Sequence, residues 1–333
     1  MDMEHYKINR LVMSWIGQWP EQTGFSRIFL SFNLIFAVSS QLCLQMKNLL
    51  IEMRNSWNLA TLNAQIQILR KYTDKGKKLT KIYAAIMYSS MSMYMTLPII
   101  PSIVAFFTNA NQTQMYGLLY HVETIFNVER YYYFILLHSY YTTFFLMTIP
   151  VATDSMLVIY VQHACGLFEA IGYQLENIKQ NDRTDINIYP QYKDDEHYRI
   201  ISDSAAKHIE VLQFSKLLTS TYSISLLILT ILNVAVMTFS GLVALININR
   251  PLEAFRYAVT CLCLTMHFLF LSMPGQQLID HSSNVYESIY AVKWYAISVR
   301  ARKLLNLMLI RCRTPCQITA GKMSIMSLKT FST

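Results

Sequence analysis

The chain has 333 residues, of which 53% are hydrophobic and only 14% carry a charge. About a quarter of the residues of a soluble domain are charged, so this composition excludes an ordinary water-soluble globular protein. The net charge is +8. Because the basic residues flank long apolar stretches, we assign this charge to a membrane surface and expect membrane lipid, not nucleic acid, as its partner.

Five uncharged, apolar stretches follow one another along the chain, each near or above the roughly 18 residues of a spanning helix. They are Ile28 to Met46, Tyr83 to Phe107, Tyr131 to Thr153, Leu217 to Ile246 and Tyr257 to Pro274. Five soluble helices that were apolar on every face would leave no residues to meet water. We therefore predict an all-α, polytopic membrane helix bundle that forms a single domain over residues 1–333. The predicted spans are about 28–46, 83–107, 131–161, 217–246 and 255–274, followed by a cytosolic region over 275–333.

Basic side chains predict the orientation, because short loops rich in Lys and Arg stay in the cytosol. The segment from Lys47 to Lys81 is strongly basic and is predicted to be a cytosolic loop. The tail after Pro274 is strongly basic as well and is also predicted to be cytosolic. The segment between them, Thr108 to Arg130, has a single basic residue and is predicted to lie outside. It contains the triplet Asn111-Gln112-Thr113, which makes Asn111 a candidate for N-glycosylation on the lumenal side.

The segment from Gln162 to Leu212 is predicted to return to the cytosol, although its acidic residues outnumber its basic ones. Acidic residues contribute little to this orientation rule. We expect a polar loop near Lys179 to Glu196, between helices that extend the membrane spans into the cytosol.

Motifs for catalysis, phosphate binding or metal ligation do not occur in the sequence. We therefore expect no enzyme activity, catalytic residue, metal or cofactor. The six cysteines form no C-x-x-C pair, which indicates neither a disulfide framework nor a zinc site. Cys312 and Cys316 lie beside Arg311 and Arg313, which leaves two alternatives: acylation at a membrane surface, or ordinary reduced thiols.

Ionisable residues inside predicted spans are costly in lipid and usually face a partner or a cavity. His138, Asp154 and His267 are such residues. We expect Asp154, near the inner end of its helix, to orient that helix by reaching water or a cytosolic Lys. For the two histidines we expect neutral, hydrogen-bonded packing in preference to proton transfer.

Tyrosine, phenylalanine and methionine are dense in the second and third predicted spans. Rings at membrane depth either pack helices and form an interfacial belt, or line a cavity for a small apolar ligand. The sequence leaves both alternatives open.

Several short motifs, in this order along the chain, resemble the insect odorant receptors, in particular those of ants, bees and wasps. They are Gly17-Gln18-Trp19-Pro20, the stretch from Tyr72 to Thr80, Gly275-Gln276-Gln277-Leu278, Thr319-Ala320-Gly321-Lys322 and Ser327 to Phe331. The resemblance covers nearly the whole chain and is strongest in the C-terminal part, where 275–333 is similar to the family's cytosolic anchor region. It implies the family's seven-helix bundle of inverted topology.

The resemblance also implies a function: an odorant-binding tuning subunit that assembles with a shared co-receptor into a hetero-tetrameric, ligand-gated cation channel. Such channels lie in the plasma membrane of olfactory-neuron dendrites and open when a small volatile odorant occupies a pocket in the outer half of the membrane. Carried over to the matching spans, the resemblance implies these ligand-binding candidates: Met91, Tyr94, Tyr133, Leu137, Tyr140 and Tyr257.

The sequence departs from the family pattern in two places. One early span and the pore-lining last helix are not found, and a single span before Lys47 would place the N-terminus outside instead of inside. A non-functional, truncated receptor product is therefore one alternative. Another multi-pass receptor or a transporter is a second alternative.

Overall fold

The computed structural model describes residues 46–57, 63–96, 128–178, 191 and 195–332. The chain divides into two compact units, residues 1–59 and 60–333. In the first unit the described residues 46–57 form a helix. Nearly all of the predicted span 28–46, the residues 97–107 of the next span and the glycosylation candidate Asn111 lie outside the described residues.

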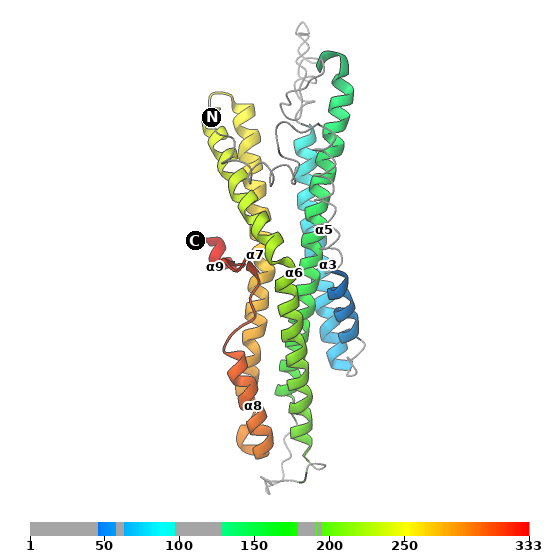
Figure 1. The fold of residues 1–333 in the computed structure, drawn as a ribbon, viewed down its shortest axis with the longest axis vertical. Helices are drawn as coiled ribbons and strands as arrows, with labels where there is room; N and C mark the ends of the chain where they lie inside the picture. Colours follow the sequence, from blue (N-terminus) through cyan, green and yellow to red (C-terminus); the bar gives the residue numbers. More distant parts are fainter. Residues whose placement is uncertain (1–45, 58–62, 97–127, 179–190, 192–194, 333) are drawn as a thin grey trace, which may run out of the picture. The chain divides into compact units, whose positions relative to one another are not determined.

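Four long helices build the second unit, and Figure 1 gives their labels. They are α3 (Asn63–Thr96), α5 (Val128–Glu176), α6 (Glu196–Ile246) and α7 (Pro251–Ala291). In the described part of the chain, three helices are long and apolar enough to cross a membrane: Tyr131–Glu176, Glu196–Ile246 and Ala254–Ala291. They contain the last three predicted spans, and α3 contains the described part of 83–107.

Shorter elements follow α7. They are the 3-10 helix η3 (Trp294–Ala296), α8 (Val299–Cys312), β1 (Thr319–Ala320), β2 (Ser324–Ile325) and α9 (Leu328–Ser332). The two strands pair antiparallel, with Thr319 opposite Ile325 and Ala320 opposite Ser324. Figure 1 shows α8 beside the end of α7, and α8 packs against both α6 and α7.

The helices extend well beyond the predicted spans. As expected, α5 continues to Glu176 and α6 begins at Glu196, where the Asp195 side chain accepts a hydrogen bond from the Tyr198 amide at 2.9 Å. The interpretation of the basic segment 47–81 as a loop was wrong in both of its described parts, because residues 46–57 are helical and α3 begins at Asn63. The Gln, Leu, Lys and Arg residues of this segment lose little side-chain freedom in a helix. They therefore favour a helix outside the membrane as well as inside it.

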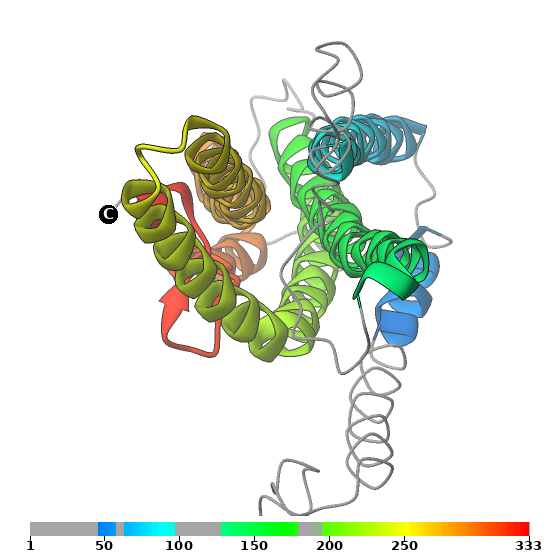
Figure 2. The same ribbon diagram turned by 90° about the horizontal axis from the view of Figure 1, so that it is seen from above.

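Packing is closest in the half of the bundle that holds the helix extensions beyond the predicted spans. There α5 packs against α3, α6 and α7 (Figures 1 and 2), and Tyr160, Phe168 and Leu175 of α5 are almost fully buried. In the other half, large apolar side chains such as Tyr141 and Phe239 are exposed. Exposed apolar side chains suit helices that face lipid, because lipid tails are as apolar as the side chains themselves.

Polar contacts join the helix extensions to one another. The Gln65 amide of α3 donates to Gln174 of α5 at 3.1 Å, and Gln174 donates to Asp203 of α6 at 3.0 Å. The Tyr72 hydroxyl of α3 lies 2.7 Å from Nε2 of His281 in α7. These side-chain contacts link α3 to α5, α5 to α6, and α3 to α7.

The β1–β2 hairpin lies between α6 and α7. The Gly321 amide donates to the Ser223 carbonyl of α6 at 2.9 Å, and a Cβ on Gly321 (φ +59°) would lie 2.4 Å from a methyl group of Leu227. On α7, a Cβ on Gly275 would lie 1.9 Å from the Met326 carbonyl oxygen. Both glycines therefore allow a backbone approach that any side chain would block.

Candidate functional site

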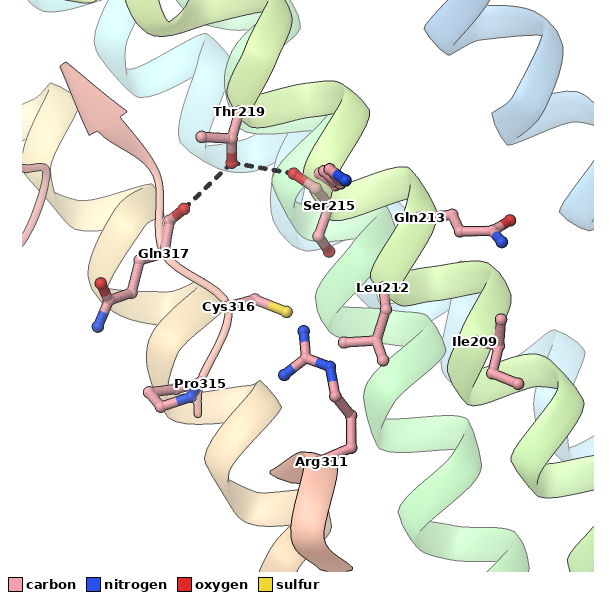
Figure 3. A pocket seen from close by; sticks show the side chains of 10 residues that line it. Ile209, Leu212, Gln213, Ser215, Thr219, Arg311, Pro315, Cys316 and Gln317 are labelled. Atoms are coloured by element: carbon pink, nitrogen blue, oxygen red, sulfur yellow. Dashed lines mark hydrogen bonds between the residues drawn. The ribbon is translucent and has the colours of Figure 1, made fainter. Parts of the chain in front are cut away.

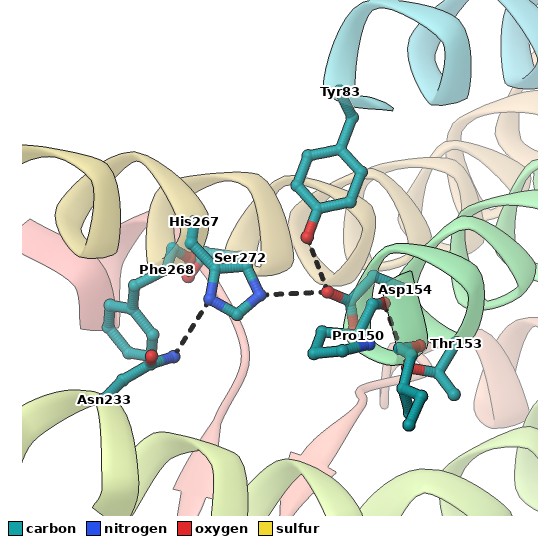
Figure 4. Close-up of polar contacts among 9 residues, drawn as sticks. Tyr83, Pro150, Thr153, Asp154, Asn233, His267, Phe268 and Ser272 are labelled. Atoms are coloured by element: carbon teal, nitrogen blue, oxygen red, sulfur yellow. Dashed lines mark hydrogen bonds and ion pairs between the residues drawn. The ribbon is translucent and has the colours of Figure 1, made fainter. Parts of the chain in front are cut away.

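A buried polar network joins all four long helices (Figure 4). Asp154 Oδ2 of α5 accepts a hydrogen bond from the Tyr83 hydroxyl of α3 at 2.7 Å, and it lies 2.9 Å from Nε2 of His267 in α7. The other ring nitrogen of His267, Nδ1, lies 3.3 Å from Nδ2 of Asn233 in α6. Tyr83 also stacks on Phe270 with ring centroids 3.8 Å apart.

A neutral imidazole satisfies every contact of this network. If Asn233 donates to Nδ1 of His267, the ring proton is on Nε2 and points at Asp154. Asp154 then accepts two hydrogen bonds on one oxygen, from Tyr83 and from His267, and charge-assisted bonds of this kind are the stronger ones. The network therefore fixes the mutual rotation of four helices inside the membrane.

The partners of Asp154 correct one expectation. We expected it to reach water or a cytosolic Lys, but its side chain is buried and bonded to Tyr83 and His267. The structural reason is that Tyr83 and His267 bring their donors to the same depth as Asp154. The hydrogen-bonded packing expected of His267 is confirmed. The same expectation for His138 was wrong within the described residues, because that side chain is exposed and forms no hydrogen bond there.

A second group of polar contacts lies further along the same helices, toward the predicted outer side. Nη2 of Arg256 in α7 donates to the Tyr94 hydroxyl of α3 at 2.8 Å, and the guanidinium lies 5.0 Å from the centre of the Tyr94 ring. The Tyr140 hydroxyl of α5 donates to the Met95 carbonyl of α3 at 2.9 Å. A cation held by a hydroxyl and a ring is thus placed inside the predicted span 255–274.

Distances along α7 give the depth of each group. At about 1.5 Å per residue, the helix from Arg256 to Gly275 is about 28 Å long, close to the ~30 Å hydrocarbon core of a bilayer. His267 lies between them, about 16 Å from Arg256. The Asp154–His267 network therefore lies near the middle of this predicted span, with Arg256 at its predicted outer end and Gly275, which contacts the hairpin, at its predicted inner end.

The structure divides the six ligand-binding candidates. Met91 is buried, and Tyr94, Tyr140 and Tyr257 are half-buried on the three helices that meet at this outer level. Tyr133 and Leu137, by contrast, are 84% and 68% exposed. Tyr140 lies near Tyr94, because its hydroxyl bonds to the carbonyl of Met95, the next residue of α3. Exposed Tyr133 and Leu137 are not part of that group.

Sequence reasoning did not single out Arg256, Tyr83 or Asn233. A signal was present for Arg256, since an arginine inside a predicted span is rare and usually functional. The sequence gives no such signal for Tyr83 and Asn233, because neither is charged and the partners of both are distant in sequence. In the described part of the chain, no group of three or more His, Cys, Asp or Glu side chains is arranged to hold a metal ion.

Comparison with solved structures gives the same fold. OR5, an insect olfactory receptor from Machilis hrabei, matches in complex with eugenol with a TM-score of 0.65, at 13% identity over 98% of this chain and 92% of that one. A second OR5 structure matches with a TM-score of 0.55, at 12% identity over 99% of this chain and 94% of that one. The fold is therefore that of the insect odorant receptors.

Sequence comparison finds relatives in Drosophila melanogaster. Odorant receptor 85f is 24% identical over 260 residues, which cover 75% of this chain and 62% of that protein. Odorant receptor 49a is 32% identical over 79 residues, 24% of this chain and 20% of that protein. The chain thus spans less than two thirds of either relative. A sequence model described as 7tm odorant receptor matches residues 26–333. The chain belongs to this family of insect odorant receptors, which are membrane receptors of olfaction and not enzymes.

Proposed function

We propose that this chain is an odorant-binding tuning subunit of a ligand-gated cation channel in olfactory sensory neurons. In this proposal a small, mostly apolar volatile binds in the outer half of the membrane, between α3, α5 and α7. Its partner is the co-receptor of the family, with which it forms a hetero-tetramer in the plasma membrane of the dendrite. The family membership and the fold support this proposal.

The contact between Tyr94 and Arg256 is the observation that best supports particular residues as the odorant site. A charged residue near the hydrocarbon core is costly unless it has polar partners, and such residues usually mark a functional site. Here the guanidinium lies beside half-buried Tyr94, among the aromatic and Met side chains that suit an apolar ligand with one polar group. The related OR5 structure is a complex with eugenol, a ligand of that general kind.

We keep all six candidates, Met91, Tyr94, Tyr133, Leu137, Tyr140 and Tyr257, as proposed ligand-binding residues. The four that are buried or half-buried are expected to contribute more than exposed Tyr133 and Leu137. The exposed pair lies on α5, where a residue contacts lipid or a neighbouring subunit as readily as a ligand.

The test is a recording of currents from cells that express this chain with the co-receptor, during exposure to a panel of volatiles. We expect at least one volatile to elicit a current that cells with the co-receptor alone do not give. Surface labelling shows whether the chain has reached the plasma membrane. A chain that reaches the surface and responds to no volatile contradicts the channel role and favours the alternative of a non-signalling receptor product.

A further inference from the structure

A cavity of about 370 Å³ lies between α6 and the segment that connects α8 to β1. Its walls include Leu212, Ser215 and Thr219 on α6 and Arg311 at the end of α8. Figure 3 shows the Arg311 side chain extended toward Cys316 and Leu212, along one wall of the cavity. The Thr219 hydroxyl donates to the Gln317 carbonyl at 3.1 Å and so holds the connecting segment against α6.

Two cations line this cavity, Lys216 and Arg311, and no carboxylate does. In the described part of the chain neither cation forms an ion pair. Arg311 donates through Nη1 to the carbonyl and the hydroxyl of Thr314, at 3.0 and 2.8 Å. These bonds fix the guanidinium while Nε and Nη2 stay available. A concave site with two uncompensated cations and fixed N–H donors suits an anion with several oxygens, such as a phosphate.

The depth of the cavity points to the source of that phosphate. Lys216 immediately precedes the uncharged stretch Leu217 to Ile246, which is about 45 Å long as a helix, the thickness of a bilayer with its headgroup layers. From Ser223, which bonds the hairpin, Lys216 is about 10 Å further along α6. That distance places Lys216 among the headgroups on the predicted cytosolic side, the leaflet in which anionic lipids collect.

We propose that this cavity is a binding site for the headgroup phosphate of an anionic phospholipid, with Lys216 and Arg311 as its two cationic ligands. The lipid would bind where α6, α8 and the hairpin segment meet, at the opposite membrane boundary from the proposed odorant pocket. The site is independent of the proposed odorant response. It is tested by lipid binding alone.

The experiment titrates the purified full chain in detergent with a short-chain phosphatidylinositol bisphosphate and follows the unfolding temperature to obtain a dissociation constant. The test variant is Lys216→Gln with Arg311→Gln. At about five-fold in affinity for each basic residue near an anionic headgroup, we expect the dissociation constant to rise about 25-fold. The matched control is Arg300→Gln with Lys303→Gln, which removes the same charge from exposed positions of α8 outside the cavity. We expect it to shift the constant less than about two-fold.

A charge-conserving exchange, Lys216→Arg with Arg311→Lys, separates loss of the site from loss of the fold. We expect it to bind the lipid within a few-fold of the original chain. If the control pair weakens lipid binding as much as the test pair does, only surface charge matters and the proposal is overturned. Full loss of binding in the exchange variant would also overturn it. A second arm adds inorganic phosphate and inositol trisphosphate without acyl chains. Binding as tight as that of the lipid would mean a soluble anion site and would overturn the lipid assignment.

Discussion

Asp154 and His267 lie 2.9 Å apart, Oδ2 to Nε2, although 113 residues separate them in the chain. The contact joins α5 to α7 at the middle of the predicted membrane thickness. The Tyr83 hydroxyl of α3 donates to the same Asp154 oxygen, and the Asn233 side chain of α6 contacts the other ring nitrogen of His267. Because all four helices share one set of hydrogen bonds, a substitution at Asp154 is expected to weaken the packing of all four helices.

Replacement of Asp154 by Ala is expected to lower the free energy of unfolding by about 3 kcal/mol. It leaves the Tyr83 hydroxyl and the His267 N–H buried without an acceptor, at about 1–3 kcal/mol each. Asp154→Asn keeps one acceptor oxygen and is expected to cost about 1 kcal/mol. Thermal unfolding of the purified chain in lipid nanodiscs measures both. Equal destabilisation by the two variants would contradict the shared-acceptor geometry.

Replacement of Gly275 by Ala is expected to detach the C-terminal hairpin from α7. The new methyl group would lie 1.9 Å from the Met326 carbonyl oxygen, so the backbone has to move, and overpacking of this kind costs about 1–3 kcal/mol. Trypsin cleavage at Lys322 and Lys329 measures the detachment. If cleavage follows the population of the detached hairpin, a cost of about 1–3 kcal/mol corresponds to an acceleration of about 5-fold to 100-fold.

Gly241→Ala is the matched control for that variant. In the described part of the chain, no atom outside the neighbouring turns of α6 lies within 4 Å of a Cβ at this position, and Ala favours a helix over Gly by about 1 kcal/mol. Cleavage of the hairpin should be unchanged in Gly241→Ala. Similar cleavage rates in both alanine variants would mean that the close approach at Gly275 does not hold the hairpin.

The thiols of Cys312 and Cys316 are expected to react slowly. Burial raises the pKa of Cys312 to about 11, and burial also raises the pKa of Cys316. With a pKa of about 11, only about 1 in 10⁴ of the Cys312 side chains is a thiolate at pH 7, and the fraction increases as the pH rises toward the pKa. These values favour the alternative of ordinary reduced thiols over that of acylation.

Mass spectrometry of N-ethylmaleimide adducts measures this reactivity. The comparison is a Lys303→Cys variant, whose thiol is at an exposed position of the same helix, α8. We expect Cys312 to label more than about 100-fold more slowly than that exposed thiol at pH 7, and the difference to shrink as the pH is raised. Labelling of Cys312 at the rate of the exposed thiol would contradict its burial.

The membrane helices were the part of the fold that could be predicted from the sequence. Lipid excludes charge, so the uncharged stretches of α5, α6 and α7 mark the spans directly. The extension of α5 and α6 beyond these spans could also be predicted. The helical extension of α3 was missed, because the rule that assigned its basic residues to the cytosol predicts a side of the membrane and not a backbone conformation.

The polar contacts could not be predicted in the same way. Asp154 and His267 were recognised as costly residues, but their pairing depends on how α5 and α7 rotate against each other. The same holds for Tyr94 and Arg256. A family resemblance pointed to Tyr133 and Leu137 beside Tyr140, yet resemblance at the level of spans does not specify which face of a helix is turned inward.

The most direct test of the proposed odorant site is the concentration that gives a half-maximal current, measured for Tyr94→Phe and for Tyr141→Phe with a volatile that activates the original chain. Both substitutions remove one hydroxyl, but Tyr94 holds Arg256, whereas Tyr141 is 64% exposed on α5. Loss of this part-buried bond to a charged group corresponds to at least about a five-fold change. We predict that change for Tyr94→Phe and none for Tyr141→Phe. An unchanged response in Tyr94→Phe, or equal shifts in both, would contradict a ligand site at the outer ends of α3 and α7.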